Sequence, residues 1–202
     1  MARMKMTCKL CRREGASLCG REKCAFKRRP YSPGVQGKAQ PRRPSVYGQQ
    51  LREKQKAKRF YQVMERQFVL YFQKALAKKG NTGEMLVQLL EQRLDNVVYR
   101  LGLAKTRAQA RQMVGHGFIQ VNAKKVNIPS FQVHLDDEIT IKESKQKKGL
   151  FIEMESRLQK QQTPKWLHLD ANSRKGKVVS QPEGDDLHQP FDPTLIVELY
   201  SR

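Results

Sequence analysis

Acidic residues, aromatic residues and long apolar runs are all scarce in this chain. Among its 202 residues, 19 Asp and Glu stand against 40 Lys and Arg, which leaves a formal net charge of +21. Hydrophobic residues at 38 % and aromatics at 7 % can build small cores, but not a large enzyme core around an enclosed pocket. No apolar run approaches the roughly 18 residues that a membrane span needs. The opening MARMKMTCKLCRR lacks the apolar stretch of a secretory signal, so secreted and membrane-spanning classes are disfavoured.

The positive charge is concentrated in the first three quarters of the chain. Residues 1–66 carry 19 Lys and Arg against four acids, and residues 67–148 carry 14 against seven. Residues 149–202 carry seven against eight. An excess of this size resists compaction and favours a polyanionic partner, which makes a nucleic acid the leading candidate.

All four cysteines lie within the first 24 residues. Cys8, Cys11, Cys19 and Cys24 form two pairs, C-x2-C and C-x4-C, separated by seven residues. Two such pairs can complete a closed tetrahedral zinc site, and the surrounding Lys and Arg are expected to lower the thiol pKa values. Four thiolates also suit an iron–sulfur cluster, while two disulfides or four free thiols are the alternatives without a metal. With no spare ligand position, the predicted site is structural.

Residues 27–45 combine four prolines, two glycines and six basic residues. This composition disfavours a helix and predicts an extended path. The segment can be a disordered linker, or a basic arm that lies along phosphates with Tyr31 and Tyr47 available to stack on bases.

Helical periodicity governs the next part of the chain. Ser45 can cap a basic helix that runs to about Arg59. An apolar stripe at Phe68, Phe72 and Leu76 predicts a second helix, which Gly80 can end. Apolar residues from Leu86 to Leu101 then recur on one face and predict one continuous helix, on whose polar side Arg93, Asn96 and Arg100 would lie.

A second short helix is predicted after this one. Thr106 and Gln109 form a capping box, and Arg107 and Arg111 would line its exposed side. His116, between two glycines at its end, is either a partner of the helix dipole or an RNA contact. Alternating residues then predict a hairpin with Ala123, Lys124 and Lys125 at its turn, followed by a strand over 138–141. Two helices and a hairpin tip that all present cations favour RNA binding.

The stretch RLDNVVYRLGLAKTRAQARQMVGHGFIQVNAKKVNIPS (93–130) closely resembles the RNA-binding module of the ribosomal S-four family. The module is also similar to parts of pseudouridine synthases, bacterial tyrosyl-tRNA synthetases and a heat-shock RNA-binding protein. RRPSVYGQQLREKQKAKRFY (42–61), ERQF (65–68), PKWLHLD (164–170) and IVELYSR (196–202) narrow the resemblance to ribosomal members of this family, in the bacterial type with a four-cysteine metal site.

The resemblance implies an α+β fold in three parts. Residues 1–44 would hold the four-cysteine metal knuckle and the basic arm. Residues 45–92, completed by about 186–202, would form a mainly helical domain. Residues 93–185 would form an inserted RNA-binding module of helices and antiparallel sheet with its extension. The strand-like run at 195–197 would return to the helical part.

The implied function is that of a structural constituent of the small ribosomal subunit in the cytoplasm. Family members bind rRNA first, nucleate assembly of the subunit body, and affect decoding fidelity near the channel where mRNA enters, beside ribosomal protein five. Some also repress translation of their own mRNA. The cofactor would be zinc, or else an iron–sulfur cluster, held by the four cysteines. The expected RNA contacts are Arg42, Arg43, Arg52, Lys54, Lys58, Arg93, Asn96, Arg100, Arg107, Gln109, Arg111, His116, Lys124 and Lys125.

An enzyme is not expected, because there is no Walker loop, GxGxxG sequence or nucleophile–base arrangement. The alternatives are a non-ribosomal RNA-binding or RNA-chaperone protein that carries the same module, and a DNA-binding zinc-knuckle regulator.

Overall fold

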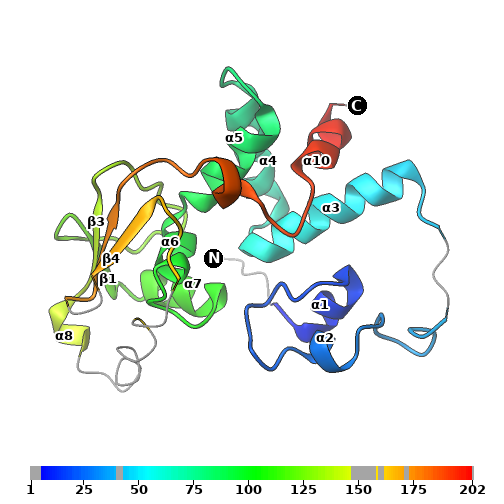
Figure 1. Cartoon of the computed structure of the whole chain (residues 1–202), viewed down its shortest axis with the longest axis horizontal. Helices are drawn as coiled ribbons and strands as arrows, with labels where there is room; N and C mark the ends of the chain where they lie inside the picture. Colours follow the sequence, from blue (N-terminus) through cyan, green and yellow to red (C-terminus); the bar gives the residue numbers. More distant parts are fainter. Residues whose placement is uncertain (1–5, 40–42, 147–157, 159–161, 171–172, 202) are drawn as a thin grey trace. The chain divides into compact units, whose positions relative to one another are not determined.

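The chain is organised as two units, each formed by its own set of elements. A computed structural model describes residues 6–39, 43–146, 158, 162–170 and 173–201. The first unit comprises Met1–Val87 and His188–Arg202, and the second comprises Gln88–Leu187 (Figure 1). Helices and an antiparallel sheet are both present, which confirms the α+β class. Among the described residues, no helix is long and apolar enough to span a membrane.

Helices build the first unit. They are α1 (Cys8–Glu14), α2 (Ala25–Arg28), α3 (Val46–Tyr61), α4 (Glu65–Leu76), the first part of α5 (Thr82–Glu91), and α10 (Pro193–Tyr200). The predicted cap of α3 is confirmed, because Ser45 Oγ accepts the Gly48 N–H at 3.2 Å. Helix α4 ends before the predicted Gly80. It buries Phe68 and Phe72, but Leu76, which was expected on the same stripe, is exposed.

The end of the chain is a helix, so the expected strand-like run at 195–197 was wrong. Pro193 occupies the first turn of α10, and the Asp192 carboxylate accepts the Thr194 N–H at 2.8 Å. Proline at the start of a helix and an acidic cap are sequence signals that outweigh a short β-branched run. Helix α10 packs on α3, and the rings of Phe72 and Tyr200 lie 4.6 Å apart (Figure 1).

In the described part of the second unit, the main elements are two helices and a five-stranded sheet. The helices are α6 (Leu94–Arg100) and α7 (Arg107–Gly115), and the strands are β1 (Ile119–Val121), β2 (Lys124–Lys125), β3 (Glu138–Ile141), β4 (Leu167–Asp170) and β5 (Lys175–Val178). The short α8 (Glu143–Gln146) and the 3-10 turn η2 (Gly184–Leu187) complete it. The strand order is β2-β1-β3-β5-β4, and all the pairings are antiparallel.

The single helix expected from Leu86 to Leu101 is two helices, α5 and α6. Between them Arg93 is extended, with φ −68° and ψ 136°, and it forms an isolated antiparallel bridge with Gln132. The Leu94 N–H donates to the Phe131 carbonyl at 2.8 Å, in place of a helical acceptor. A segment far along the chain therefore supplies the backbone partners that release these residues from the helix.

The core of the second unit lies between the helices and one face of the sheet (Figure 1). Val97 of α6, Leu101 directly after α6, and Met113 of α7 are buried with Ile139 and Val178 of the sheet. The Leu101 side chain packs directly against Gly176 of β5, where an added Cβ would lie 2.4 Å from Leu101 Cδ1. The absence of a side chain at this glycine lets the end of α6 approach the sheet.

The predicted hairpin is present, with a shorter turn than expected. Asn122 and Ala123 have φ of 50° and 63°, as in the two-residue turn with two left-handed positions. Lys124 and Lys125 form β2 itself, opposite Val121 and Gln120. The side chains of both lysines are therefore placed by strand pairing, and both residues are exposed.

Candidate nucleic-acid interface and cysteine cluster

The four cysteines gather at the start of α1 and around α2. Cys8 begins α1, Cys11 lies within it, and Cys24 precedes α2. The sulfur atoms of Cys8, Cys19 and Cys24 lie within 4.8 Å of one another. Side-chain hydrogen bonds link Cys11 to Cys19 and Cys24. In a tetrahedral zinc site the sulfurs are about 3.8 Å apart, as Zn–S bonds of about 2.3 Å require, so the three sulfurs of Cys8, Cys19 and Cys24 are close enough to bind a metal ion.

The protonation of these thiols differs from the sequence expectation. Burial raises the pKa of Cys11 to about 12, with a further increase from Cys19, and burial also raises the pKa of Cys19. For Cys24 burial acts in the same direction, but hydrogen bonds from Ser17 and from the Phe26 backbone outweigh it and lower the pKa to about 7. The expectation that nearby Lys and Arg would lower the thiol pKa values was wrong for Cys11 and Cys19, because burial is the largest influence on the pKa of each.

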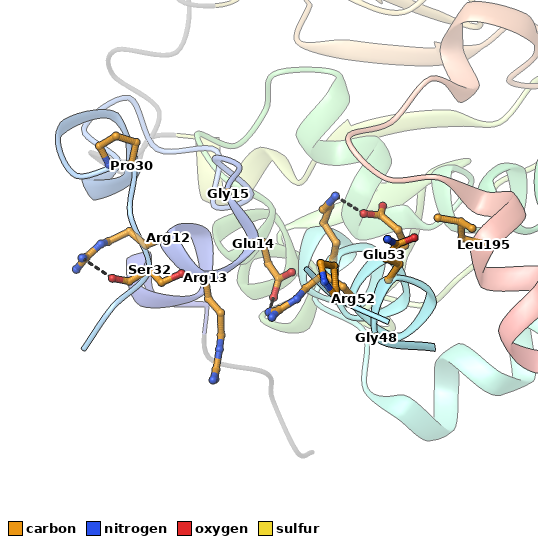
Figure 2. Close-up of a pocket in the computed structure, with 13 residues that line it drawn as sticks. Arg12, Arg13, Glu14, Gly15, Pro30, Ser32, Gly48, Arg52, Glu53 and Leu195 are labelled. Carbon is orange, nitrogen blue, oxygen red and sulfur yellow. Dashed lines mark hydrogen bonds and ion pairs between the residues drawn. The ribbon is translucent and has the colours of Figure 1, made fainter. Parts of the chain in front are cut away.

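One buried carboxylate joins the cysteine-bearing segment to α3. Glu14, at the end of α1, has a side chain with no exposed area, and it pairs with Arg59 and, at 3.5 Å, with Arg52. The pKa of Arg59 is lowered by burial and by Arg13 nearby. Figure 2 shows Glu14 pointing toward Arg52. Both residues line a pocket of about 670 Å³, together with Arg12, Arg13, Glu53 and other residues of this unit.

The part of the basic arm that the structure describes folds back on α1. Arg12 donates to the carbonyls of Tyr31 at 2.9 Å and Ser32 at 3.1 Å, and its guanidinium lies 4.7 Å from the Tyr31 ring centre. The ammonium group of Lys38 lies 5.6 Å from the same ring. Tyr31 is thus half-buried and already contacted by two cations, whereas Tyr47 is exposed.

The predicted RNA contacts of the first unit fall into two groups. Arg43 and Arg52 are exposed, and Arg42 lies outside the described residues. Lys54 and Lys58 instead both pair with Glu65 of α4, Lys54 at 2.8 Å and Lys58 at 2.5 Å. These two lysines therefore connect α3 to α4, and Lys58 is buried.

In the second unit, two acidic residues bind three of the predicted arginine contacts, Arg93, Arg100 and Arg111. Asp95 of α6 accepts from Arg93 Nε at 3.0 Å and Nη2 at 2.7 Å, and from Arg111 Nη1 of α7 at 3.0 Å. Arg93 is fully buried and Asp95 is 4 % exposed, whereas the Arg111 side chain keeps 18 % of its surface. The expectation that Arg93 lies on an exposed helix face was wrong, because the helix breaks at this residue.

Glu91 organises the other half of this arrangement. It accepts from Arg100 Nε at 3.0 Å and Nη2 at 2.8 Å, and from Asn96 Nδ2 at 2.8 Å. The Asn96 side-chain oxygen in turn accepts from Arg107 Nε at 2.8 Å, and the Arg107 guanidinium lies 4.4 Å from the Tyr99 ring centre. Asn96 and Arg107 are buried, so their predicted exposure was wrong, while the Arg100 side chain is 25 % exposed.

The remaining predicted contacts lie near the two ends of α7 and on β2. Thr106 Oγ1 accepts the Gln109 N–H at 3.2 Å, which confirms Thr106 as the cap of α7. Gln109 Oε1 accepts the N–H of Lys105, the residue before the cap, at 2.7 Å. His116, Lys124 and Lys125 are exposed, and the Lys125 side chain lies against Gly117. His116 also contacts Phe118 edge to face, with ring centres 6.0 Å apart.

Comparisons with known proteins cover nearly the entire chain. The family model described as Ribosomal protein S4/S9 N-terminal domain matches residues 3–91, and the S4 domain model matches residues 92–139. The small ribosomal subunit protein uS4 of Caldicellulosiruptor saccharolyticus is 50 % identical over 201 residues, which cover 96 % of each chain. That of Koribacter versatilis is 49 % identical over 209 aligned positions and covers both chains completely. This chain belongs to the uS4 family of small ribosomal subunit proteins.

Membership of the uS4 family confirms the family resemblance of the sequence motifs. The relatives are named as ribosomal proteins and not as enzymes, in agreement with the expectation that this chain is not an enzyme.

Sequence reasoning missed the acidic residues that organise this uS4-family chain. Glu65, Glu91 and Asp95 each hold two or more partners, yet none was singled out. One signal could have revealed two of them: between residues 85 and 135, Glu91 and Asp95 are the only acids among seven Lys and Arg. Isolated acids in such a basic stretch are natural centres for ion pairs.

Proposed function

We propose that this chain is a structural constituent of the small ribosomal subunit, in the cytoplasm, and that it binds the subunit rRNA. The observation that carries the proposal is its identity of 49 to 50 % with uS4 proteins over 96 to 100 % of both chains. The net charge of +21 supports a polyanionic partner, and the S4 domain match supports an RNA-binding module that includes residues 92–139.

For the RNA contact itself, we propose two kinds of residue. Exposed or partly exposed cations would displace counterions from phosphates, and buried members would hold them in place. The contacting group is Arg43, Arg52, Arg100, Arg111, His116, Lys124 and Lys125, with Arg42 outside the described residues. The supporting group is Lys54, Lys58, Arg93, Asn96, Arg107 and Gln109, whose polar atoms bind other residues of the chain.

Such binding explains how a protein without a catalytic site can direct assembly. Guanidinium groups bridge phosphates with a fixed geometry, and contacts to several RNA segments would hold them in one mutual orientation. From the family resemblance we further propose early binding to rRNA during assembly of the subunit body. We also propose proximity to the channel where mRNA enters and to ribosomal protein five, an influence on decoding fidelity, and repression of its own mRNA.

We also propose that three parts of the chain have different roles. Residues 1–44 would serve as the knuckle and arm, residues 45–92 with about 186–202 as the helical domain, and residues 93–185 as the RNA-binding module and its extension. These boundaries follow from the family resemblance of the sequence motifs.

We also propose a structural metal held by Cys8, Cys11, Cys19 and Cys24. The close approach of three sulfurs supports it, as does the link of Cys11 to two of them. A bound cation would stabilise thiolates that burial otherwise disfavours, and its binding energy would help to fold a short polar segment. Zinc suits the closed four-thiolate set, and an iron–sulfur cluster is the alternative.

Elemental analysis of the full chain tests the metal. One zinc per chain, lost from the Cys11→Ser variant, is the expected result. If the chain contains iron and acid-labile sulfide in place of zinc, the metal site holds an iron–sulfur cluster. A chain that contains neither, and whose thermal unfolding does not respond to added zinc, would overturn the metal site.

Binding to protein-free small-subunit rRNA tests the function. The comparison uses unrelated RNA of equal length and duplex DNA, each across a salt series. One-to-one binding that prefers the rRNA and survives raised salt is expected. Equal affinities that collapse together with salt would leave only nonspecific phosphate binding. Preference for duplex DNA would favour a DNA-binding regulator, and loss of the chain from salt-washed subunits would favour a transient RNA chaperone.

A further inference from the structure

Asp95 is a nearly buried acidic residue that pairs with two of the arginines predicted to contact RNA. The residue is 4 % exposed, and its carboxylate accepts three hydrogen bonds from two guanidinium groups. Arg93 binds it in a bidentate manner from the start of α6, and Arg111 binds it from α7. The carboxylate thus connects two separate elements of the second unit through a pair of arginines.

The two arginines differ in what they still offer to a partner. Arg93 is fully buried, so its guanidinium can bind only other residues of the chain. The Arg111 side chain keeps 18 % of its surface and binds Asp95 through Nη1. A guanidinium carries five donor hydrogens in a rigid fork, so a single bond to Asp95 fixes the plane of Arg111 while other donors remain for a phosphate.

Electrostatics alone argues against an acid at this place. A carboxylate near bound RNA repels phosphates and reduces the charge that drives counterion release. A free arginine side chain, however, loses rotamer freedom when it binds, which costs affinity, and an internal partner removes that cost in advance. These two effects of the same carboxylate on RNA affinity have opposite signs.

We propose that Asp95 is a positioning residue for RNA recognition, which holds the Arg111 guanidinium in the orientation that contacts the rRNA backbone. Arg93 supports the carboxylate from the other side. Glu91 acts alongside it by binding Arg100, the second partly exposed arginine of this surface. This inference rests on the proposed rRNA-binding function and assigns a role to an acid that does not itself touch RNA.

The Asp95→Asn variant separates positioning from simple charge. It raises the net charge by one and keeps the side-chain volume. If only charge matters, rRNA binding becomes tighter. If Asp95 positions Arg111, specific rRNA binding weakens by about two- to tenfold, the range that corresponds to ordering one long side chain on binding. Binding to duplex DNA of unrelated sequence should stay equal or strengthen.

Asp136→Asn is the matched control. Asp136 pairs with Lys177 at 2.9 Å in the second unit, and its side chain is 82 % exposed, so the substitution makes the same change of charge without releasing an arginine of the α6–α7 surface. Its rRNA affinity should equal that of the unchanged chain or exceed it slightly. Asp95→Asn binding rRNA as tightly as Asp136→Asn would overturn the proposal.

A second variant keeps the test decisive if Asp95→Asn lowers stability. Arg111→Lys keeps the positive charge but loses the fork, and it should weaken rRNA binding with little effect on thermal unfolding. In a double-mutant cycle, the combined variant should lose no more affinity than the single variant that binds rRNA less tightly, because both substitutions remove the same oriented guanidinium group. Additive losses would show that Asp95 acts elsewhere. Absence of rRNA preference in the unchanged chain would instead reject the proposed function.

Discussion

The Tyr200 hydroxyl donates a hydrogen bond of 2.9 Å to Glu65 Oε1, across 135 positions of the sequence. The same carboxylate accepts from Lys54 and Lys58, so one acidic side chain joins α3, α4 and α10. The last helix of the chain is thereby held to the beginning of the helical unit, together with the aromatic contacts of Tyr200 with Phe68 and Phe72.

This carboxylate should make the stability of the first unit depend on acidity. Burial alone would raise the pKa of Glu65, but the hydrogen bonds from Lys54, Lys58 and Tyr200 outweigh it and lower the pKa from 4.5 to about 2. A carboxyl group whose pKa is lower in the folded state stabilises the fold at pH values above its pKa in the unfolded chain. This stabilisation is lost as pH falls from about 4.5 toward 2. Because the side chain is 42 % exposed, solvent reduces the size of the effect.

Urea unfolding at pH 7 and pH 3 checks this dependence. Glu65→Gln should lower the free energy of unfolding at pH 7 and flatten its decline toward pH 3. Glu84→Gln, an exposed glutamate that binds only the nearby Asn81 among the described residues, should leave the profile unchanged. An unaltered decline in Glu65→Gln would show that other carboxylates carry the acid sensitivity.

Substitution of Glu14 should loosen the cysteine-bearing segment. Glu14→Gln leaves the Arg59 guanidinium, which is 16 % exposed, without its anionic partner. We expect a loss of about 1–3 kcal/mol, the cost of leaving a buried polar group unsatisfied, and faster proteolysis within residues 8–39. Limited proteolysis with mass spectrometry measures this, with Glu84→Gln again as the control. Equal cleavage rates would mean that α1 and α3 are held by apolar contacts alone.

Gly176 should not tolerate a side chain. Gly176→Ala brings a Cβ to 2.4 Å and 2.7 Å from the two methyl groups of Leu101, which is fully buried and has little room to move. Overpacking of this kind costs about 1–3 kcal/mol. Thermal unfolding measures the loss, and Gly115→Ala at the end of α7, where a Cβ would meet nothing within 4 Å, is the matched control. Equal melting temperatures for the two variants would contradict the close approach.

The hairpin lysines should contribute to rRNA binding through phosphates. Replacing Lys124 and Lys125 together by Ala should reduce the slope of log affinity against log salt by about one for each phosphate contact that is lost. Lys175 and Lys177 of β5 serve as the matched control, because each is already in an ion pair. Lys175 pairs with Glu138 at 3.0 Å, and Lys177 pairs with Asp136 at 2.9 Å. Equal slopes in the two double variants would remove the hairpin from the proposed contact surface.

Signals between near neighbours determined much of this protein from the sequence alone. Ser45 and Thr106 cap their helices as predicted, because a cap depends only on residues three positions apart. Alternation correctly predicted a hairpin, although not the residues of its turn, and correctly placed the strand at 138–141. Three of the four cysteines that the spacing grouped lie close together. The family could also be identified from the sequence, because its motifs consist of contiguous residues.

Only the tertiary structure decided where the long helix breaks and which cations are already paired. The apolar period from Leu86 to Leu101 is compatible with one helix, but the Leu94 N–H finds a backbone acceptor at Phe131, and Arg93 becomes buried against Asp95. Likewise, Lys58 meets Glu65 only once α3 and α4 have packed. Helical periodicity shows which residues share a face, but a buried ion pair or a bridge to a distant segment depends on partners that folding alone brings together.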